Sequence, residues 1–134
     1  MKIETGKGLW VSNSFTERFG NEDIIPANTV PEFRILPRNM YDHEINDELG
    51  VEECTLGDVA AFLENPPDGT KDGSWNLFRL PGCVVLVCWF ADYRKWNVFD
   101  WGLDGGNWHA GYRVFSRNWR SEPEASALSS SDTL

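Results

Sequence analysis

One apolar run limits what this chain can fold into more than any other feature. The run extends from Cys83 to Phe90 and is apolar at both alternating sets of positions. Its eight residues are too few for a membrane helix, which needs about 20. The length and the pattern instead predict a central β-strand that is covered on both faces.

Three further strand candidates surround this run. Residues 75–80 precede it across a Pro-Gly turn, and residues 96–100 and 112–115 follow it. The connections between the first three strands are short, which favours an antiparallel meander. A loop rich in glycine and asparagine separates the last two strands.

Helical periodicity is confined to residues 40–64. Tyr41, Ile45 and Leu49 recur every four residues, with Asn39 as a candidate N-cap and Gly50 as a candidate stop. This pattern predicts a short acidic amphipathic helix.

A capping-box pattern indicates where a second helix begins. Thr55 and Asp58 have the spacing of a capping box, in which Asp replaces the usual Glu or Gln. The residues that follow place four apolar side chains on one face: Leu56, Val59, Ala60 and Leu63. The helix should end at the Asn-Pro-Pro sequence that begins at Asn65.

These elements predict a single α+β domain over residues 1–120. We expect a small antiparallel meander of three or four strands, with the two helices of residues 40–64 packed on one face. Three prolines within residues 1–39 predict extended segments and turns there rather than a helix. Residues 121–134 are rich in Ser, Glu and Ala and predict a disordered acidic tail.

The charge is strongly segregated along the chain. The net charge is −9, and residues 40–72 carry ten acidic side chains against Lys71 alone. Residues 73–120 carry six basic and three acidic side chains. An acidic chain disfavours general binding to a phosphate backbone and favours encounter with a basic partner. We therefore predict an acidic face formed by four side chains of the first helix: Asp42, Glu44, Asp47 and Glu48.

No motif predicts catalysis, a metal site or a cofactor. Asp68, Thr70 and Asp72 match the start of a calcium loop, but Arg79 stands where a glutamate is needed. His43 begins a zinc-protease pattern whose second histidine is replaced by Asp47. The three cysteines, an odd number with no CxxC spacing, favour free thiols in the core.

Aromatic residues are concentrated in the second half of the chain. Residues 75–119 hold twelve of the eighteen aromatic side chains, interspersed with arginines. Most of these rings should build the core, but there are more than a small sheet requires, so we expect some at an interface. The loop 101–111 contains two tryptophans among flexible glycines, and it predicts five contact residues: Trp101, Trp108, His109, Arg113 and Arg117.

Several segments in a fixed order resemble a group of small uncharacterised proteins of bacteriophages, prophages and their hosts. The segments are 36–40, 44–46, 48–50, 55–58, 96–98, Trp108 with 110–111 and, most specifically, the Arg-Val-Phe-Ser-Arg-Asn run at 113–118. The resemblance spans about residues 33–118. It implies a mobile-element accessory protein and no particular reaction.

Two classes of function fit these features. The first is a non-enzymatic accessory protein that binds and modulates a host or phage protein with a basic surface, an anti-defence inhibitor being one such protein. The second is a single-stranded nucleic-acid-binding module that uses the Trp/Arg-rich sheet region. The start of the chain, from Met1 to Glu4, lacks the pattern of a secretion signal, so we expect the host cytoplasm and no membrane partner.

Overall fold

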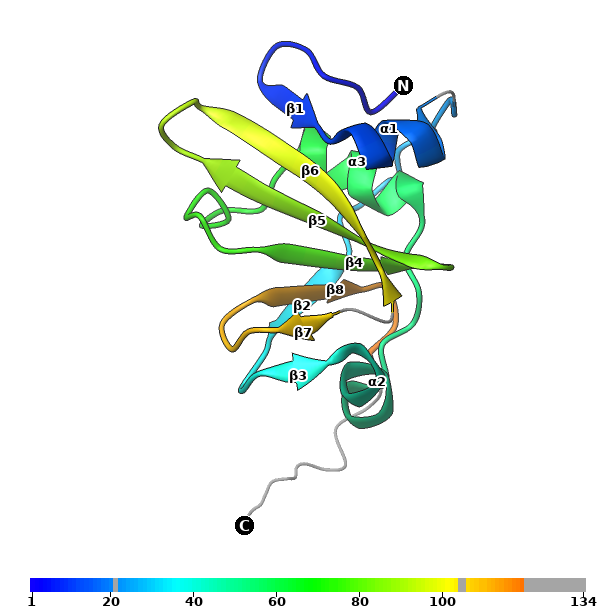
Figure 1. Ribbon diagram of the computed structural model, residues 1–134, viewed down its shortest axis with the longest axis vertical. Helices are drawn as coiled ribbons and strands as arrows, with labels where there is room; N and C mark the ends of the chain where they lie inside the picture. Colours follow the sequence, from blue (N-terminus) through cyan, green and yellow to red (C-terminus); the bar gives the residue numbers. More distant parts are fainter. Residues whose placement is uncertain (21, 104–105, 120–134) are drawn as a thin grey trace.

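The computed structural model describes residues 1–20, 22–103 and 106–119. Within them, a six-stranded sheet of order β1-β6-β5-β4-β8-β2 forms the body of the molecule (Figure 1). A second, two-stranded sheet pairs β3 (Met40–Tyr41) with β7 (Asn107–Trp108). The prediction of a small antiparallel meander of three or four strands is therefore wrong.

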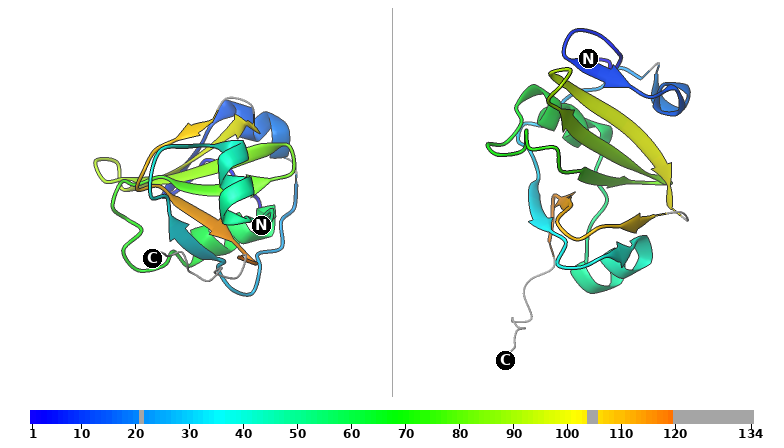
Figure 2. Two further views of the ribbon diagram at one scale, coloured as in Figure 1. Left: turned by 90° about the horizontal axis from the view of Figure 1, so that it is seen from below. Right: turned by 60° about the vertical axis from the view of Figure 1, so that its left-hand side comes forward.

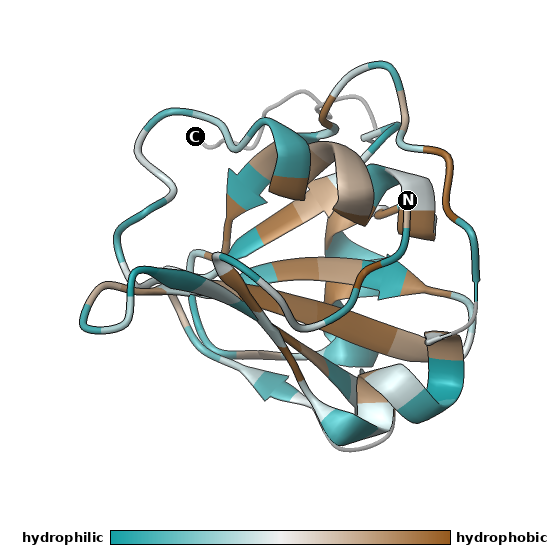
Figure 3. Cartoon of the chain, turned by 90° about the horizontal axis from the view of Figure 1, so that it is seen from above, coloured by the Kyte–Doolittle hydropathy of each residue, from teal (hydrophilic) through white to brown (hydrophobic). Residues whose placement is uncertain are grey.

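The meander itself exists at the centre of the larger sheet. β4 (Asn76–Leu80), β5 (Cys83–Phe90) and β6 (Lys95–Gly102) are consecutive antiparallel neighbours. All residues of β5 from Cys83 to Cys88 are buried, and β5 is predominantly hydrophobic (Figure 3). The prediction of a central strand covered on both faces is confirmed.

Short segments far away in the sequence extend the meander at both edges. β1 (Leu9–Val11) pairs in parallel with β6, and β8 (Arg113–Ser116) pairs in parallel with β4. β2 (Glu32–Ile35) then pairs antiparallel with β8. Both outer strands of the meander would otherwise present unpaired backbone groups, which are costly to leave buried. The sheet is mixed because these partners reach it by long connections.

Helices cover both faces of the sheet, not one face as predicted. α3 (Leu56–Glu64) packs Val59 and Phe62 into one core together with Phe15 of α1 (Asn13–Phe19). α2 (Asp42–Glu44) continues as the π-helical turn η1 (Ile45–Leu49), and its Ile45 joins a second core. Figure 2 shows this helix below the sheet, at the end remote from α1.

The alternation of the strands explains why there are two cores. Val85 and Val87 of β5 face the α1–α3 side, whereas Val84 and Leu86 face the side of α2 and β3–β7. The helix α1 lies within residues 1–39, where the sequence predicted no helix. Its N-cap Ser12, whose side chain accepts from the Phe15 N–H, was not recognised as a start signal.

The predicted start of α3 and the predicted end of η1 are correct, whereas the predicted start of α2 is wrong. Thr55 and Asp58 form the reciprocal capping box of α3, as predicted. Gly50 ends η1 in the left-handed conformation, with φ of 64°, also as predicted. The N-cap of α2 is Tyr41 and not Asn39, whose side chain instead accepts a hydrogen bond from the Ala110 N–H.

No helix in the described part of the chain is long and apolar enough to cross a membrane. The predicted tail, residues 121–134, lies outside the described residues.

Candidate functional site

The sheet face that carries the second core is only partly covered. α2, η1 and the β3–β7 ribbon pack over the part near β4 and β8. Toward β1 and β6, large aromatic side chains stay open to solvent, with Trp10 39% and Trp101 53% exposed. Alternation along β1 points Leu9 and Val11 into the first core and leaves Trp10 on this open side.

Two grooves of equal size open on this side. The first, the inner groove, has a volume of about 370 Å³ and is lined by Trp75, Leu86, Phe99, Trp101, Gly106, Asn107, Trp108, His109 and Tyr112. The second, the outer groove, also has a volume of about 370 Å³ and is lined by Trp10, Phe90, Tyr93, Lys95, Asn97 and Phe99. Phe99 belongs to both, so the grooves are neighbours. We call the two together the aromatic face.

Phe99 lines both grooves and contacts an aromatic ring of each. Its centroid lies 5.2 Å from that of Trp10 and 5.4 Å from that of Trp75, both in tilted or edge-on arrangements. Such geometries are favourable for aromatic pairs. The rings of three segments far apart in the sequence are thus fixed relative to one another before any ligand binds.

Local backbone features shape the ends of the grooves. The turn between β5 and β6 places Arg94 at a φ of 52°, and it presents Tyr93, 72% exposed, at the end of the outer groove. At the inner groove, Gly106 lies directly against the indole of Trp108, where any Cβ would collide with the ring. Glycine is therefore required for this close approach.

The structure brings together three of the five predicted contact residues. Trp101, Trp108 and His109 all line the inner groove. Trp108 forms part of the groove wall and is not an exposed contact residue, because it is only 6% exposed and packs in the second core. The predicted loop 101–111 includes residues 104–105, which lie outside the described residues.

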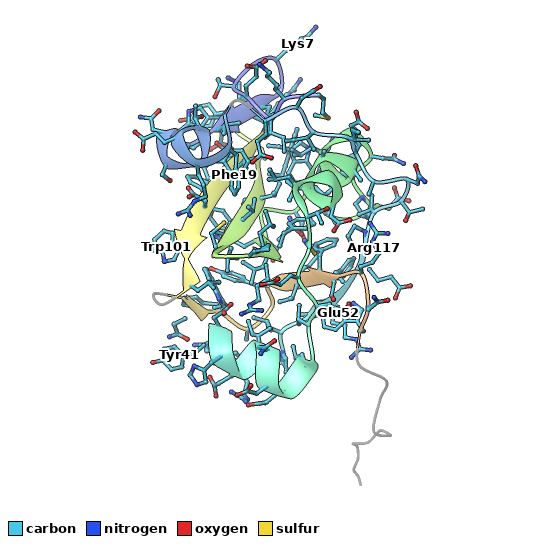
Figure 4. The ribbon with its side chains drawn as sticks, turned by 90° about the vertical axis from the view of Figure 1, so that its right-hand side faces the viewer. Lys7, Phe19, Tyr41, Glu52, Trp101 and Arg117 are labelled. Carbon is cyan, nitrogen blue, oxygen red and sulfur yellow. The ribbon has the colours of Figure 1, made fainter. Side chains whose placement is uncertain are left out.

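The two predicted arginines lie elsewhere. Arg113 is buried and donates hydrogen bonds to Asp72, to the Asn76 side chain and to the Gly69 carbonyl. Arg117 pairs with Asp58 and donates to Thr29. In Figure 4, Trp101 and Arg117 lie on opposite sides of the molecule. These guanidinium groups stabilise the fold through their ion pairs and do not line either groove.

The four side chains of the predicted acidic face are not equivalent. Asp42 is buried and accepts from Arg79, with Nε to Oδ1 at 2.9 Å. Glu44 accepts from the Tyr41 backbone N–H at 2.8 Å, which lowers its pKa, and Glu48 pairs with Arg38 at 2.6 Å. Asp47 is exposed. The free negative charge here is therefore smaller than the sequence implied.

A polar pocket adjoins the inner groove. It has a volume of about 310 Å³ and contains the Asp42–Arg79 ion pair together with Tyr41, His43 and Asn46. Gly106 lines this pocket as well as the inner groove. The aromatic face therefore continues toward the acidic helix turn.

The predicted contact residues do not include the aromatic members of this face that lie outside the loop: Trp10, Trp75, Phe90, Tyr93, Phe99 and Tyr112. Trp10 had a usable signal, because a large aromatic alternates with Leu9 and Val11 in a strand-like run. An aromatic opposite two aliphatic residues on a strand indicates a second, less covered face.

The described thiols and potential metal ligands lack the features of a nucleophile or of a metal site. Burial raises the pKa of Cys54 to about 12 and that of Cys88 to about 11, the reverse of what a nucleophile needs. Within the described ranges, no three His, Cys, Asp or Glu side chains are arranged to hold a metal ion.

The chain matches no known protein-family model, no curated protein and no solved structure. The geometry of the aromatic face is accordingly the basis for a proposed function.

Proposed function

We propose that this chain is a non-enzymatic binding protein that holds a segment of a partner protein against the aromatic face. The observation that carries the proposal is the pair of grooves joined at Phe99, with Trp10, Tyr93 and Trp101 exposed along them. Tryptophan and tyrosine are enriched among residues that dominate binding energy. Contiguous exposed apolar surface commonly marks an interaction site.

The charge pattern favours a protein partner over single-stranded nucleic acid. A stacking platform for nucleic acid needs free cations that follow the backbone. Here Arg79, Arg113 and Arg117 are each paired with an aspartate. Among the described residues that line the two grooves, Lys95 is the only lysine or arginine. These three arginines of the Trp/Arg-rich region therefore support the fold.

The same charges define the chemistry of the partner segment. The chain carries a net charge of −9, so long-range attraction favours a partner with basic side chains. The grooves are lined mainly by aromatic rings, which favours apolar anchors. We propose a segment that combines both kinds of side chain. The resemblance to phage and prophage proteins would place it in a host or phage protein, with an anti-defence inhibitor as one form of the activity.

The buried thiols support a non-enzymatic role. Cys54 donates its thiol hydrogen to the Phe115 carbonyl, and Cys88 to the Gly73 carbonyl. The raised pKa values keep both protonated near neutral pH. The histidines contact aromatic rings, His43 with Tyr41 and His109 with Tyr112.

Selection from a random displayed-peptide library, with the full chain as bait, tests this proposal. Selected peptides should be rich in apolar and basic residues. Their affinity, measured by fluorescence anisotropy, should fall at least about tenfold for a Trp10→Leu/Trp101→Leu double variant, because both anchors are lost.

Ile25→Ser is the matched control. Ile25 is 87% exposed, and its segment runs beside α3 on the far side of the sheet, where Ala27 N–H donates to the Gly57 carbonyl. This variant should bind the peptides normally. The proposal is wrong if no peptide is enriched, if both variants bind equally, or if the protein binds labelled oligothymidylate at about 0.15 M salt more tightly than it binds the peptides.

A further inference from the structure

We propose that the inner groove binds a trimethylammonium group, carried on a trimethylated lysine of the partner segment. This inference rests on the proposed function and adds to it the chemical identity of one anchor. It follows from the composition of the groove wall, from where three of the chain's own cations lie, and from the lack of charged carboxylates among the described lining residues.

Aromatic rings dominate the wall of the inner groove. Trp75, Phe99, Trp101, Trp108 and Tyr112 surround a volume of about 370 Å³, which lies within the usual range for ligand pockets of roughly 300–1,000 Å³. The faces of such rings carry partial negative charge and attract cations, tryptophan most strongly. Several rings around one volume form the arrangement that recognises quaternary ammonium groups.

Three of the chain's own cations lie over rings outside this groove. Arg34 is 4.7 Å from the centroid of Trp119, Lys71 is 4.5 Å from that of Trp89, and Arg113 is 5.5 Å from that of Phe33. None of these three rings lines the inner groove. Among the described lining residues there is no lysine or arginine, so the chain itself does not fill this site with a cation.

The missing carboxylates favour a methylated ammonium over a simple one. No aspartate or glutamate is among the described lining residues. A lysine ammonium would bring three N–H donors into a largely aromatic groove, where the side-chain acceptors of the described lining are those of Asn107, His109 and Tyr112. Each donor that loses water without a new acceptor is costly. A trimethylammonium group carries the charge without any N–H donor. The net charge of −9 favours its approach.

A pair of isosteres separates cation recognition from simple apolar burial. Choline and its neutral analogue 3,3-dimethylbutan-1-ol differ in charge but hardly in shape. In titrations followed by tryptophan fluorescence, choline should bind at least about tenfold more tightly than the neutral analogue. Equal binding of the two, or no binding of choline, would overturn the inference.

Substitutions at Trp101 locate the effect without threatening the fold, because this side chain is 53% exposed. Trp101→Leu should abolish the preference for choline, whereas Trp101→Phe should keep much of it, since the ring is retained. Ile25→Ser is the matched control, because Ile25 is 87% exposed and lines neither groove, and it should leave choline binding unchanged. An unchanged preference in Trp101→Leu would contradict the assignment to the inner groove.

The source of the group is tested with a peptide selected on the wild-type protein. Trimethylation of its lysine should tighten binding at least about fivefold to the wild type and not to Trp101→Leu. If choline binds but the trimethylated peptide is no tighter, the assignment to a partner's lysine is wrong. If peptide binding depends on the grooves while choline fails to bind, only this inference falls and the proposed function stands.

Discussion

Trp10 and Phe99 contact each other across the parallel pair β1–β6, with ring centroids 5.2 Å apart and planes inclined at 56°. One ring comes from the first strand of the chain and the other from the meander. Because Phe99 also lines the inner groove, this contact connects the N-terminal segment to both halves of the aromatic face.

The contact should be measurable as a coupling energy. A double-mutant cycle of Trp10→Leu and Phe99→Leu, followed by urea unfolding, should give a favourable coupling of about 0.5–1.5 kcal/mol, as is typical of aromatic pairs. Trp10→Leu with Trp119→Leu is the matched cycle, because Trp119 contacts Arg34 instead, and it should be additive. Additivity in the first cycle would show that the rings do not interact.

The two tryptophans of the predicted loop should differ in their effect on stability. Trp108 is 6% exposed, so Trp108→Ala should reduce the free energy of unfolding by about 3–5 kcal/mol. Trp101 is 53% exposed, so Trp101→Ala should reduce it by less than about 1 kcal/mol. Chemical denaturation of both variants measures the difference, and similar losses would mean that Trp101 is part of the core.

Acid should weaken the fold through Asp72. The hydrogen bond from Arg113 holds the pKa of this carboxyl below its usual range. A depressed pKa in the folded state stabilises the protein above the unfolded value, about 3.9, and this stabilisation disappears as pH falls through the folded value.

Asp72→Asn should therefore cost roughly 1 kcal/mol at pH 6, a modest figure because the Asp72 side chain is 46% exposed. The cost should shrink as pH falls below about 4, because the wild type then loses the same charge. Urea unfolding at pH 6, 4 and 3 measures this. A cost independent of pH would show that the carboxylate charge is not what stabilises Arg113.

The cysteines should react only slowly in the folded protein. Burial raises the pKa of Cys54 to about 12 and of Cys88 to about 11, so almost no thiolate exists at pH 8. Titration with Ellman's reagent should be slow in buffer and should reach all three thiols in guanidinium chloride. Rapid reaction of one thiol in the folded protein would reveal an accessible cysteine. It would count against the proposed non-enzymatic role.

Local signals in the sequence predict the structure correctly where that structure depends on a single segment. The capping box at Thr55 and Asp58, the stop at Gly50 and the apolar run of β5 each follow from neighbouring residues. The parallel pairs β1–β6 and β4–β8 do not, because they join segments far apart in the chain. Nothing within Leu9-Trp10-Val11 specifies which strand it will pair with.

The residues of the candidate site, too, were predictable only where they lie close together in the sequence. Trp101, Trp108 and His109 are close in sequence and share the inner groove. Arg113 and Arg117 follow them closely in the sequence, but their carboxylate partners, Asp72 and Asp58, come from distant segments. Whether a charged side chain is free or paired depends on tertiary contacts that a single sequence does not reveal.

The seven tryptophans provide the most direct test of where the partner segment binds. Four line the aromatic face, Trp10, Trp75, Trp101 and Trp108, whereas Trp89, Trp96 and Trp119 lie outside both grooves. Two-dimensional ¹H–¹⁵N spectra of the indole N–H groups should be recorded while a selected peptide is added. We expect the resonances of the first four tryptophans to shift and those of the other three to stay unchanged. Shifts confined to Trp89, Trp96 or Trp119, or no shift at all on saturation, would contradict this expectation.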